Sequence, residues 1–221
     1  SSLTVSGEAS VTTLDIGGTE KQLLNVVPRL SKGGLQIAIA TFMQPGKLAP
    51  LLEKEGIYVF SPNIPRWAEI ITPIMFILKI LWLGKLIASI RPAVVHTFLP
   101  QAYLLGGLWA VLLRVPVRIM SRRSLNHYQQ KHPLLCRLEY WLHGQTHLLL
   151  GNSSAVVEQL KIEAGKDANR VQIIRNGIDT KPFLRTKPLA QVRSELAIPE
   201  DALLITKVAN YISYKGHSDL L

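Results

Sequence analysis

DIGGTEKQLL, residues 15–24, has the pattern of a strand that turns sharply into a helix. The adjacent Gly17 and Gly18 permit positive φ angles and a close backbone approach by a ligand. Thr19, followed three residues later by Gln22, is a capping-box pattern that predicts the start of a helix. The free amides and the positive dipole end of such a helix favour an anion, typically phosphate. The alternative is a tight connection that binds nothing.

The residues on either side of this turn differ in how clearly they predict structure. Leu23, Val26, Val27 and Leu30 recur at helical spacing, which predicts that one apolar face of the helix packs against a sheet. Residues 1–14 should hold the strand that leads into the turn, but SSLTVSGEASVTTL contains no good apolar run. The sequence therefore predicts a first strand that is cut short or altered.

The composition indicates a globular protein with room for a large core. The chain has 221 residues, of which 48% are hydrophobic, enough for one big domain or one domain and part of another. Its single cysteine, Cys136, excludes an internal disulfide framework and a zinc site with several thiolates. Because Cys136 lies in an apolar helical pattern, we expect a buried structural thiol.

The charge is strongly positive and partly local. The formal net charge is +10, and residues 114–137 contain six Lys or Arg and no Asp or Glu. Such a field attracts nucleic acid, an anionic membrane surface or phosphorylated substrates, although a solvated face is the simplest alternative. The basic residues are not interleaved with aromatics in a nucleic-acid-binding motif, so no nucleic-acid partner is predicted.

Residues 70–90, IITPIMFILKILWLGKLIASI, approach the length of a membrane span but carry Lys79 and Lys85. With Pro73 and Gly84 also present, the stretch favours a buried or membrane-surface helix over a span. The first ten residues lack the basic and apolar regions of a secretory signal. We expect a cytoplasmic protein, with peripheral contact to an anionic membrane as a hypothesis.

Strand patterns alternate with helix patterns along most of the chain. Strands are predicted at residues 35–42, 57–60, 93–97, 117–121 and 147–152, and residues 171–179 are predicted to form a strand followed by a turn. Helices are predicted at residues 47–55, 70–90, 101–113, from Pro133 to about Gly144, and after the capping Ser153. Repeated βαβ units give a parallel sheet with right-handed crossovers, so the fold class is α/β, doubly wound and Rossmann-like.

The pattern changes near residue 182. We predict a first domain at residues 1–181, a linker with one short helix at 182–200, and a strand that opens a second domain at 201–221. About twenty residues are too few to bury a second core, so this domain is expected to be truncated.

Six stretches together resemble the retaining GT-B glycosyltransferases of glycosyltransferase family 4, also called group 1. They are DIGGTEKQLL at 15–24, VVHTFLPQAYLLG at 94–106, RIMSRRSLNHY at 118–128, GNSSAVVEQL at 151–160, VQIIRNGID at 171–179 and VANYISYKGHSDLL at 208–221. Each is weak alone, but their shared order over almost the whole chain is specific.

The resemblance implies two Rossmann-like domains that face each other, the first for the acceptor and the second for a nucleotide sugar. This chain resembles the acceptor domain and the start of the donor domain. The intact enzyme would be a hexosyltransferase that moves a sugar from a nucleotide diphosphate to an acceptor hydroxyl with retention. Its acceptor would be a glycan or lipid-linked precursor in polysaccharide or glycolipid synthesis. The fragment alone is expected to be inactive, because the family's two donor-binding glutamates would lie beyond Leu221.

The resemblance also assigns the donor diphosphate site. It places Gly17 and Gly18 under the diphosphate, where backbone amides stabilise the departing phosphate. Lys215 matches the family's lysine that contacts the same group. Asn210 stands where the family often has an arginine, so one donor-site cation is missing.

The other candidate site residues follow the remaining strands, where doubly wound sheets form their ligand crevice. They are His96, as a candidate catalytic residue, and Arg122, Arg123 and Asn152, as candidate acceptor-binding residues. The structural alternatives are a buried hydrogen-bonded histidine, a solvated basic loop from Arg122, and an asparagine that closes a strand.

Two further expectations concern structure and cofactors. In the 176–179 motif, Gly177 is expected to adopt a left-handed turn, and Asp179 to accept backbone hydrogen bonds. The chain has no aspartate pair for a catalytic metal, which agrees with a metal-independent family that needs no cofactor.

The rival interpretation is a non-catalytic module that binds a membrane surface or an anionic ligand on the same fold. Trp67, Phe76 and Trp82, in or beside the apolar helix, could sit at an anionic interface or pack on the sheet.

Overall fold

The computed structural model describes residues 18–42, 45–62, 73–125, 132–181, 184, 186–209 and 216–220. The chain divides into two compact units, Ser1–Ile178 and Asp179–Leu221. The first unit holds the layered α/β domain, and the second holds one short helix. The predicted domain boundaries at residues 181 and 200 remain predictions.

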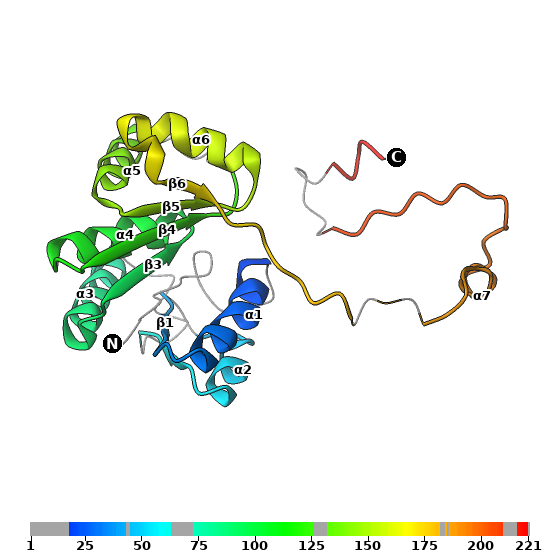
Figure 1. Cartoon of the computed structure of the whole chain (residues 1–221), viewed down its shortest axis with the longest axis horizontal. Coiled ribbons are helices and arrows are strands. Elements are labelled where there is room, and N and C mark those ends of the chain that lie inside the picture. Colours follow the sequence, from blue (N-terminus) through cyan, green and yellow to red (C-terminus); the bar gives the residue numbers. More distant parts are fainter. Residues whose placement is uncertain are drawn as a thin grey trace. The chain divides into compact units, whose positions relative to one another are not determined.

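The first unit alternates strands and helices (Figure 1). Its elements are α1 (Gly18–Lys32), β1 (Ala38–Ala40), α2 (Ala49–Lys54), β2 (Tyr58–Phe60), α3 (Pro73–Ile90), β3 (Val94–Phe98), α4 (Pro100–Leu112), β4 (Val117–Arg122), α5 (Pro133–Gln145), β5 (Leu148–Gly151), α6 (Ser154–Ala164), the 3-10 helix η4 (Gly165–Arg170) and β6 (Val171–Ile173). Every strand pair is parallel. The predicted α/β class is confirmed.

The described strands form two sheets, one of order β1-β2 and one of order β3-β4-β5-β6. Apolar side chains join them: Leu83 of α3 packs in one cluster with Ala40 of β1 and Val95 of β3. Leu23 of α1 shares a second cluster with Phe98 at the end of β3. The first strand expected within residues 1–14 lies outside the described residues.

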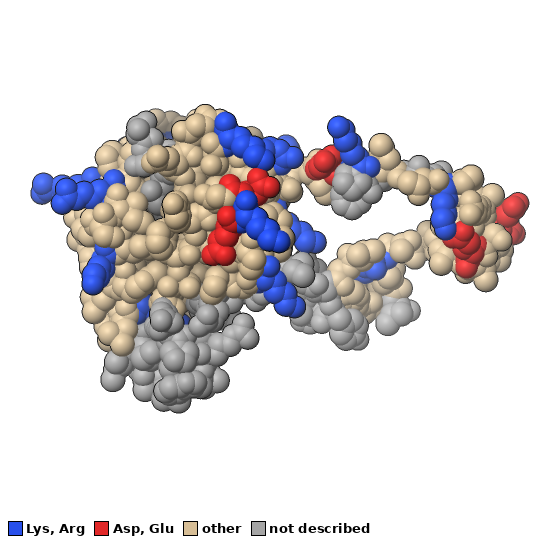
Figure 2. Space-filling view, turned by 90° about the horizontal axis from the view of Figure 1, so that it is seen from below, with Lys and Arg blue, Asp and Glu red and all other residues tan. Residues whose placement is uncertain are grey.

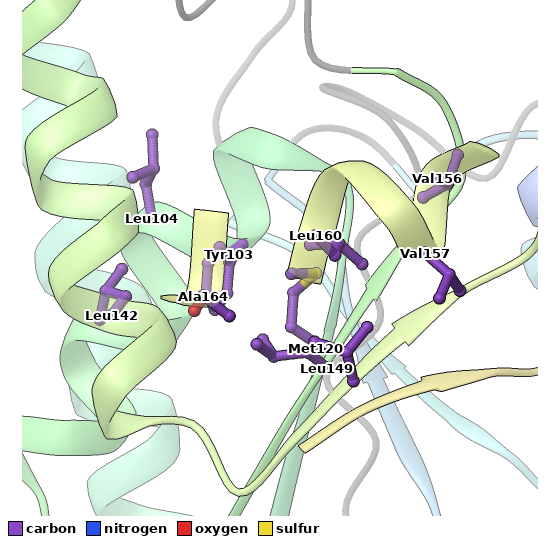
Figure 3. Close-up of a cluster of buried hydrophobic side chains, with 10 residues drawn as sticks. Tyr103, Leu104, Met120, Leu142, Leu149, Val156, Val157, Leu160 and Ala164 are labelled. Atoms are coloured by element: carbon purple, nitrogen blue, oxygen red, sulfur yellow. The ribbon is translucent and has the colours of Figure 1, made fainter. Parts of the chain in front are cut away.

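The largest buried cluster covers the four-stranded sheet with α4, α5 and α6 (Figure 3). Its buried members are Tyr103, Leu104, Met120, Leu142, Leu149, Val156, Val157, Leu160, Ala164 and Val171. Each buried side chain of this size stabilises the fold by about 1.5–3 kcal/mol of transfer free energy. This cluster therefore fixes β4, β5 and β6 against the three helices, and β3 is held through its pairing with β4.

Local contacts mark the ends of several elements, and the Ser153 cap and the Asp179 hydrogen bond were predicted. α1 stops at Lys32, and Gly34 follows with φ 93°, which suits glycine. The Ser153 side chain accepts a hydrogen bond from the Val156 amide at 3.4 Å and caps α6. At the start of the second unit, Asp179 Oδ1 accepts a hydrogen bond from the Lys181 amide at 3.1 Å.

Other local predictions are wrong. α1 already begins at Gly18, so Thr19 lies inside its first turn and is not the N-cap. Gly177 does not adopt a positive φ angle. Cys136 is only partly buried, because it lies in the first turn of α5, before the buried stretch that begins at Glu139.

The strand predictions overestimate length. In the stretch predicted at 35–42, the strand β1 covers only Ala38–Ala40, with an isolated bridge at Gln36. The strand and turn predicted at 171–179 give the short strand β6. In the second unit, helix α7 (Leu189–Glu195) matches its prediction, but residues 202–209 form no strand. A strand exists only where a neighbour supplies hydrogen bonds, and sequence pattern does not reveal the neighbour.

The long apolar stretch forms α3, whose described part begins at Pro73. Among the described helices, none combines the length and the apolar character that a membrane crossing requires. Near its start, Phe76, Ile77, Leu78 and Leu81 keep between 45% and 54% of their surface exposed. α3 is therefore a core helix on one face and carries an exposed apolar group on another.

Candidate functional site

A pocket lies where the carboxyl ends of β3, β4, β5 and β6 approach α1. Its volume is about 220 Å³. Its lining residues are Gln22, Leu23, Val26, Val27, Leu30, His96, Phe98, Ser121, Arg122, Arg123, Leu150, Gly151, Asn152, Ile174, Arg175 and Asn176. The four candidates predicted after the strands, His96, Arg122, Arg123 and Asn152, all line it. The parallel register explains this, because it aligns the carboxyl ends of neighbouring strands at one edge.

His96 is fixed by neighbours on its own sheet. Its Nε2 lies 2.7 Å from Ser121 Oγ, and its ring stacks on Phe98 with centroids 4.2 Å apart. Burial, with the positive charge of Arg123 as a second cause, lowers the pKa of His96 to about 4. The ring is therefore neutral at neutral pH and offers hydrogen bonds without charge.

Arg122 is the last residue of β4 and is buried, which contradicts the structural alternative of a solvated loop that begins there. Its Nη2 donates to Glu139 Oε1 of α5 at 2.6 Å and lies 2.7 Å from Glu163 Oε2 of α6. All three side chains are at most 4% exposed. Two carboxylates thus neutralise this guanidinium and tie the end of β4 to both covering helices.

The network continues into the core through His143 of α5. His143 Nε2 lies 3.3 Å from Glu163 Oε2, and His143 Nδ1 lies 2.9 Å from Tyr103 Oη of α4. Tyr103 Oη is also 3.0 Å from Thr146 Oγ1. No motif in the sequence predicted this network. Its detectable signal was the placement of acids and a histidine on otherwise apolar helical faces.

Arg123 links three parts of the pocket edge. Its Nη2 donates to Asn176 Oδ1 in the segment after β6, and its backbone oxygen accepts from Asn152 Nδ2 at 3.2 Å. Burial lowers the pKa of Arg123, while attraction to Glu20 in the first turn of α1 opposes that shift. Arg123 is therefore a partly buried cation held between α1 and the strand ends.

The start of α1 carries the donor-site prediction. Gly18 is the first helical residue, and among the described residues a Cβ added there would meet no atom within 4 Å beyond its own neighbours in the helix. Gly17, Lys215 and Asn210, the other candidates for the donor diphosphate, lie outside the described residues. Space beside Gly18 is thus available to a ligand, as the prediction requires.

Two backbone features shape the same edge. A Cβ on Gly151 would lie 2.7 Å from Val157 Cγ2, so glycine is needed where β5 ends against α6. Leu99, directly after β3, has φ 69°, a region that costs a non-glycine residue about 1–3 kcal/mol. The turn from β3 into α4 is therefore strained beside the pocket.

The positive charge is less concentrated than the sequence indicates. Arg122 is neutralised by two buried carboxylates that lie outside the basic stretch. On the face in Figure 2, Lys and Arg are spread over the surface, and some lie beside a group of acidic side chains. The pocket edge is a better candidate for anion contact than the basic stretch as a whole.

In the described part of the chain, one group of side chains has the spacing of a metal site. Ligand atoms of Glu139, His143 and Glu163 lie within 4.8 Å of one another. The Arg122 guanidinium already supplies the positive charge between the two carboxylates. A divalent cation there would meet that charge at close range, so these residues do not fit a metal.

The comparisons with known proteins point to one family and one fold. A family model described as Glycosyltransferase Family 4 matches residues 16–182. Crystal structures of HepE from Anabaena in complex with UDP (17% identity, TM-score 0.62) and of a glycosyltransferase from Rickettsia africae (15%, 0.58) are similar to the chain. They cover 89% and 90% of this chain, and the matches span 50% and 51% of theirs.

A UDP-N-acetylglucosamine 2-epimerase is also similar (16% identity, TM-score 0.57, 80% of this chain and 49% of that chain). A comparison with curated proteins finds no match. At these identities the structural likenesses show the fold alone, and the chain spans about half the length of the structures it matches. An epimerase among them shows that the fold does not fix the reaction.

We predict that Arg122→Met lowers the free energy of unfolding by about 3 kcal/mol, because it leaves the buried carboxylates of Glu139 and Glu163 without the cation between them. Urea unfolding followed by circular dichroism measures the change. The matched control is Glu158→Gln, which removes an exposed pair with Lys161 and should cost less than about 1 kcal/mol. Equal losses in the two variants would contradict the structural role of the network.

We predict that the His96 ring titrates near pH 4, as measured by NMR of its ring protons. The folded ring resists protonation and the unfolded ring does not, so stability should fall as the pH drops from about 6.5 to about 4. In the His96→Gln variant, this fall in stability between about pH 6.5 and about pH 4 should be absent. In the control variant His132→Gln, at an exposed position, it should remain. A His96 titration near pH 6.5 would contradict the assignment.

Proposed function

The chain belongs to Glycosyltransferase Family 4, and from this premise we propose that it is the acceptor-binding part of a retaining glycosyltransferase. The intact protein would transfer a hexose from a nucleotide diphosphate to an acceptor hydroxyl. The observation that carries the proposal is the pocket at the sheet edge, where predicted site residues from separate strands meet beside α1. We propose polysaccharide or glycolipid synthesis as the pathway class.

Nucleotide sugars are supported as donors by the solved structures. HepE was crystallised with UDP and with UDP-glucose. In this chain we assign the donor diphosphate to Gly17, Gly18 and Lys215, with Asn210 as a neutral neighbour. Backbone amides at the start of α1 would stabilise the departing diphosphate, and the nearby space would admit it without side-chain bulk.

The acceptor would lie in the pocket and be oriented by its edge. We assign direct contact to Arg123 and Asn152, which bind each other and are held at fixed positions. His96 would donate or accept a hydrogen bond as a neutral ring, because its lowered pKa makes it a weak base. We assign Arg122 a positioning role, since its charge is taken up by Glu139 and Glu163.

We propose that transfer needs neither a metal ion nor a cofactor. The described residues with metal-like spacing are already engaged by Arg122, which supports this assignment. The donor-binding domain is proposed to follow the acceptor domain, which agrees with the half-length match to solved structures. The 221-residue chain alone would therefore bind an acceptor but would not catalyse sugar transfer.

A second proposal is peripheral contact with an anionic membrane at the cytoplasmic face. Phe76, Ile77 and Leu81 of α3 keep about half of their surface exposed, which is unusual for a helix of such apolar composition. The +10 net charge would favour anionic lipid. Trp67 lies outside the described residues, and Trp82 packs at the margin of the core.

The same surface would also serve a non-catalytic binding module, which is the alternative function. The two functions differ in the sequence expected beyond Leu221 in the full-length protein. Two glutamates eight positions apart in a complete second domain favour the enzyme, and their absence favours the module. Reading the full-length sequence decides between them.

We predict that the full-length protein hydrolyses or transfers from a UDP- or GDP-sugar and that Gly18→Val lowers turnover at least about 100-fold. Among the described residues, a Cβ added at Gly18 meets no atom beyond its own neighbours in the helix, so the valine should obstruct the diphosphate and spare the fold. Release of UDP or GDP is measured in buffer containing EDTA. Gly144→Val, at an α5 glycine that does not line the pocket and whose added Cβ would meet only Asp167 Oδ2, at 3.6 Å, tests for general damage to the protein.

Unchanged turnover in Gly18→Val would refute the phosphate role. A requirement for Mg²⁺ in the same assay would overturn the metal-independent proposal.

We predict that the chain floats with vesicles of phosphatidylserine and phosphatidylcholine and that rising salt weakens this association. Phe76→Glu combined with Leu81→Glu should reduce the bound fraction at least fivefold. Ile162→Glu, at an 82% exposed position on α6, is the matched control and should bind as the parent does. A chain that stays in the lower fraction at low salt would refute the membrane proposal.

A further inference from the structure

The α1 side of the pocket is chemically different from its strand side. Leu23 and Val27 of α1 are buried in the core, whereas Val26 and Leu30 remain 37% and 39% exposed while they line the pocket. The sequence predicted that all four face the sheet. Ile174, after β6, is 57% exposed and lines the same pocket. Aliphatic surface therefore faces the pocket from α1 and from the segment after β6.

Polar groups gather at the strand ends. His96 and Ser121 bind each other, and Arg123 binds Asn152 and Asn176. Most of these groups already have partners, so this end offers a few remaining donors and acceptors rather than a strong ionic site. The pocket thus combines a small polar end with an aliphatic wall, which suits a ligand with a polar head and an apolar chain.

From this division we propose that the α1 side of the pocket binds an aliphatic chain attached to the acceptor sugar, whose hydroxyls face the strand ends. The inference rests on the proposed function, because it specifies the acceptor class of the same pocket. Val26, Leu30 and Ile174 are the residues that select the chain. A free polar sugar would leave this aliphatic surface in contact with water and would gain nothing from it.

The volume sets how much of the chain is held. A pocket of about 220 Å³ is smaller than a glucose ring with an octyl chain, so part of such a ligand lies outside it and only some of the methylenes are buried. Each fully buried methylene strengthens binding about fourfold. Because the aliphatic wall is partly exposed, the methylenes are not all fully buried. We therefore expect lengthening the chain from one carbon to eight to raise the affinity at least about 100-fold, less than about fourfold for every added methylene would give.

The test compares methyl β-glucoside with octyl β-glucoside, kept below its micelle concentration, by titration calorimetry on the 221-residue chain. We expect octyl glucoside to bind at least about 100-fold more tightly. Val26→Asp should reduce its affinity at least tenfold, and Val26→Thr, which nearly keeps the shape of valine, should reduce it about threefold. Ile162→Asp on α6 is the matched control and should bind as the parent does.

Equal affinities for the two glucosides would overturn the inference, as would unchanged octyl glucoside binding in both Val26 variants. The proposed function is judged separately, by donor turnover in the full-length protein. Turnover without any preference for the octyl chain would refute only the acceptor class. If the chain prefers octyl glucoside but the full-length protein shows no donor turnover, only the proposed transferase activity is refuted.

Discussion

The Arg122 guanidinium, buried between the carboxylates of Glu139 and Glu163, is the interaction on which the candidate site depends. It joins the last residue of β4 to α5 and α6 at distances of 2.6 and 2.7 Å. Burying these charges costs free energy, and the pairing offsets that cost only while all three residues stay in place. Because Arg122 is held in place, the backbone of the next residue, Arg123, is also held in place. Its position sets the contacts of Arg123 to Asn152 and Asn176.

The sequence was enough to predict which strand ends would meet. His96 lies near the carboxyl end of a strand with a clear apolar pattern, and Arg123 and Asn152 directly follow two more, so parallel pairing brings all three to one edge. It was not enough to predict their partners. Arg122 lies 17 residues from Glu139 in the chain, and its ion pair depends on how α5 and α6 pack, which local pattern does not encode.

The same limit explains the errors in the elements. Val26 and Leu30 have the spacing of a buried face, but the helix packs through Leu23 and Val27 and leaves the other two at the pocket. Residues 202–209 have the composition of a strand, but a strand requires a neighbour to pair with. Periodicity thus identifies surfaces that can be buried, and tertiary packing decides which of them are.

The split between the β1-β2 pair and the four-stranded sheet has a mechanical consequence. In the described residues, α1 is joined to the end of β3 through apolar packing of Leu23 and Val27 with Phe98, supplemented by the attraction between Glu20 and Arg123. Apolar packing has no preferred direction, so the position of α1 against the end of β3 is set by side-chain shape. The width of the pocket therefore depends on the sizes of Leu23, Val27 and Phe98, whereas a ladder of backbone hydrogen bonds fixes the strand ends opposite.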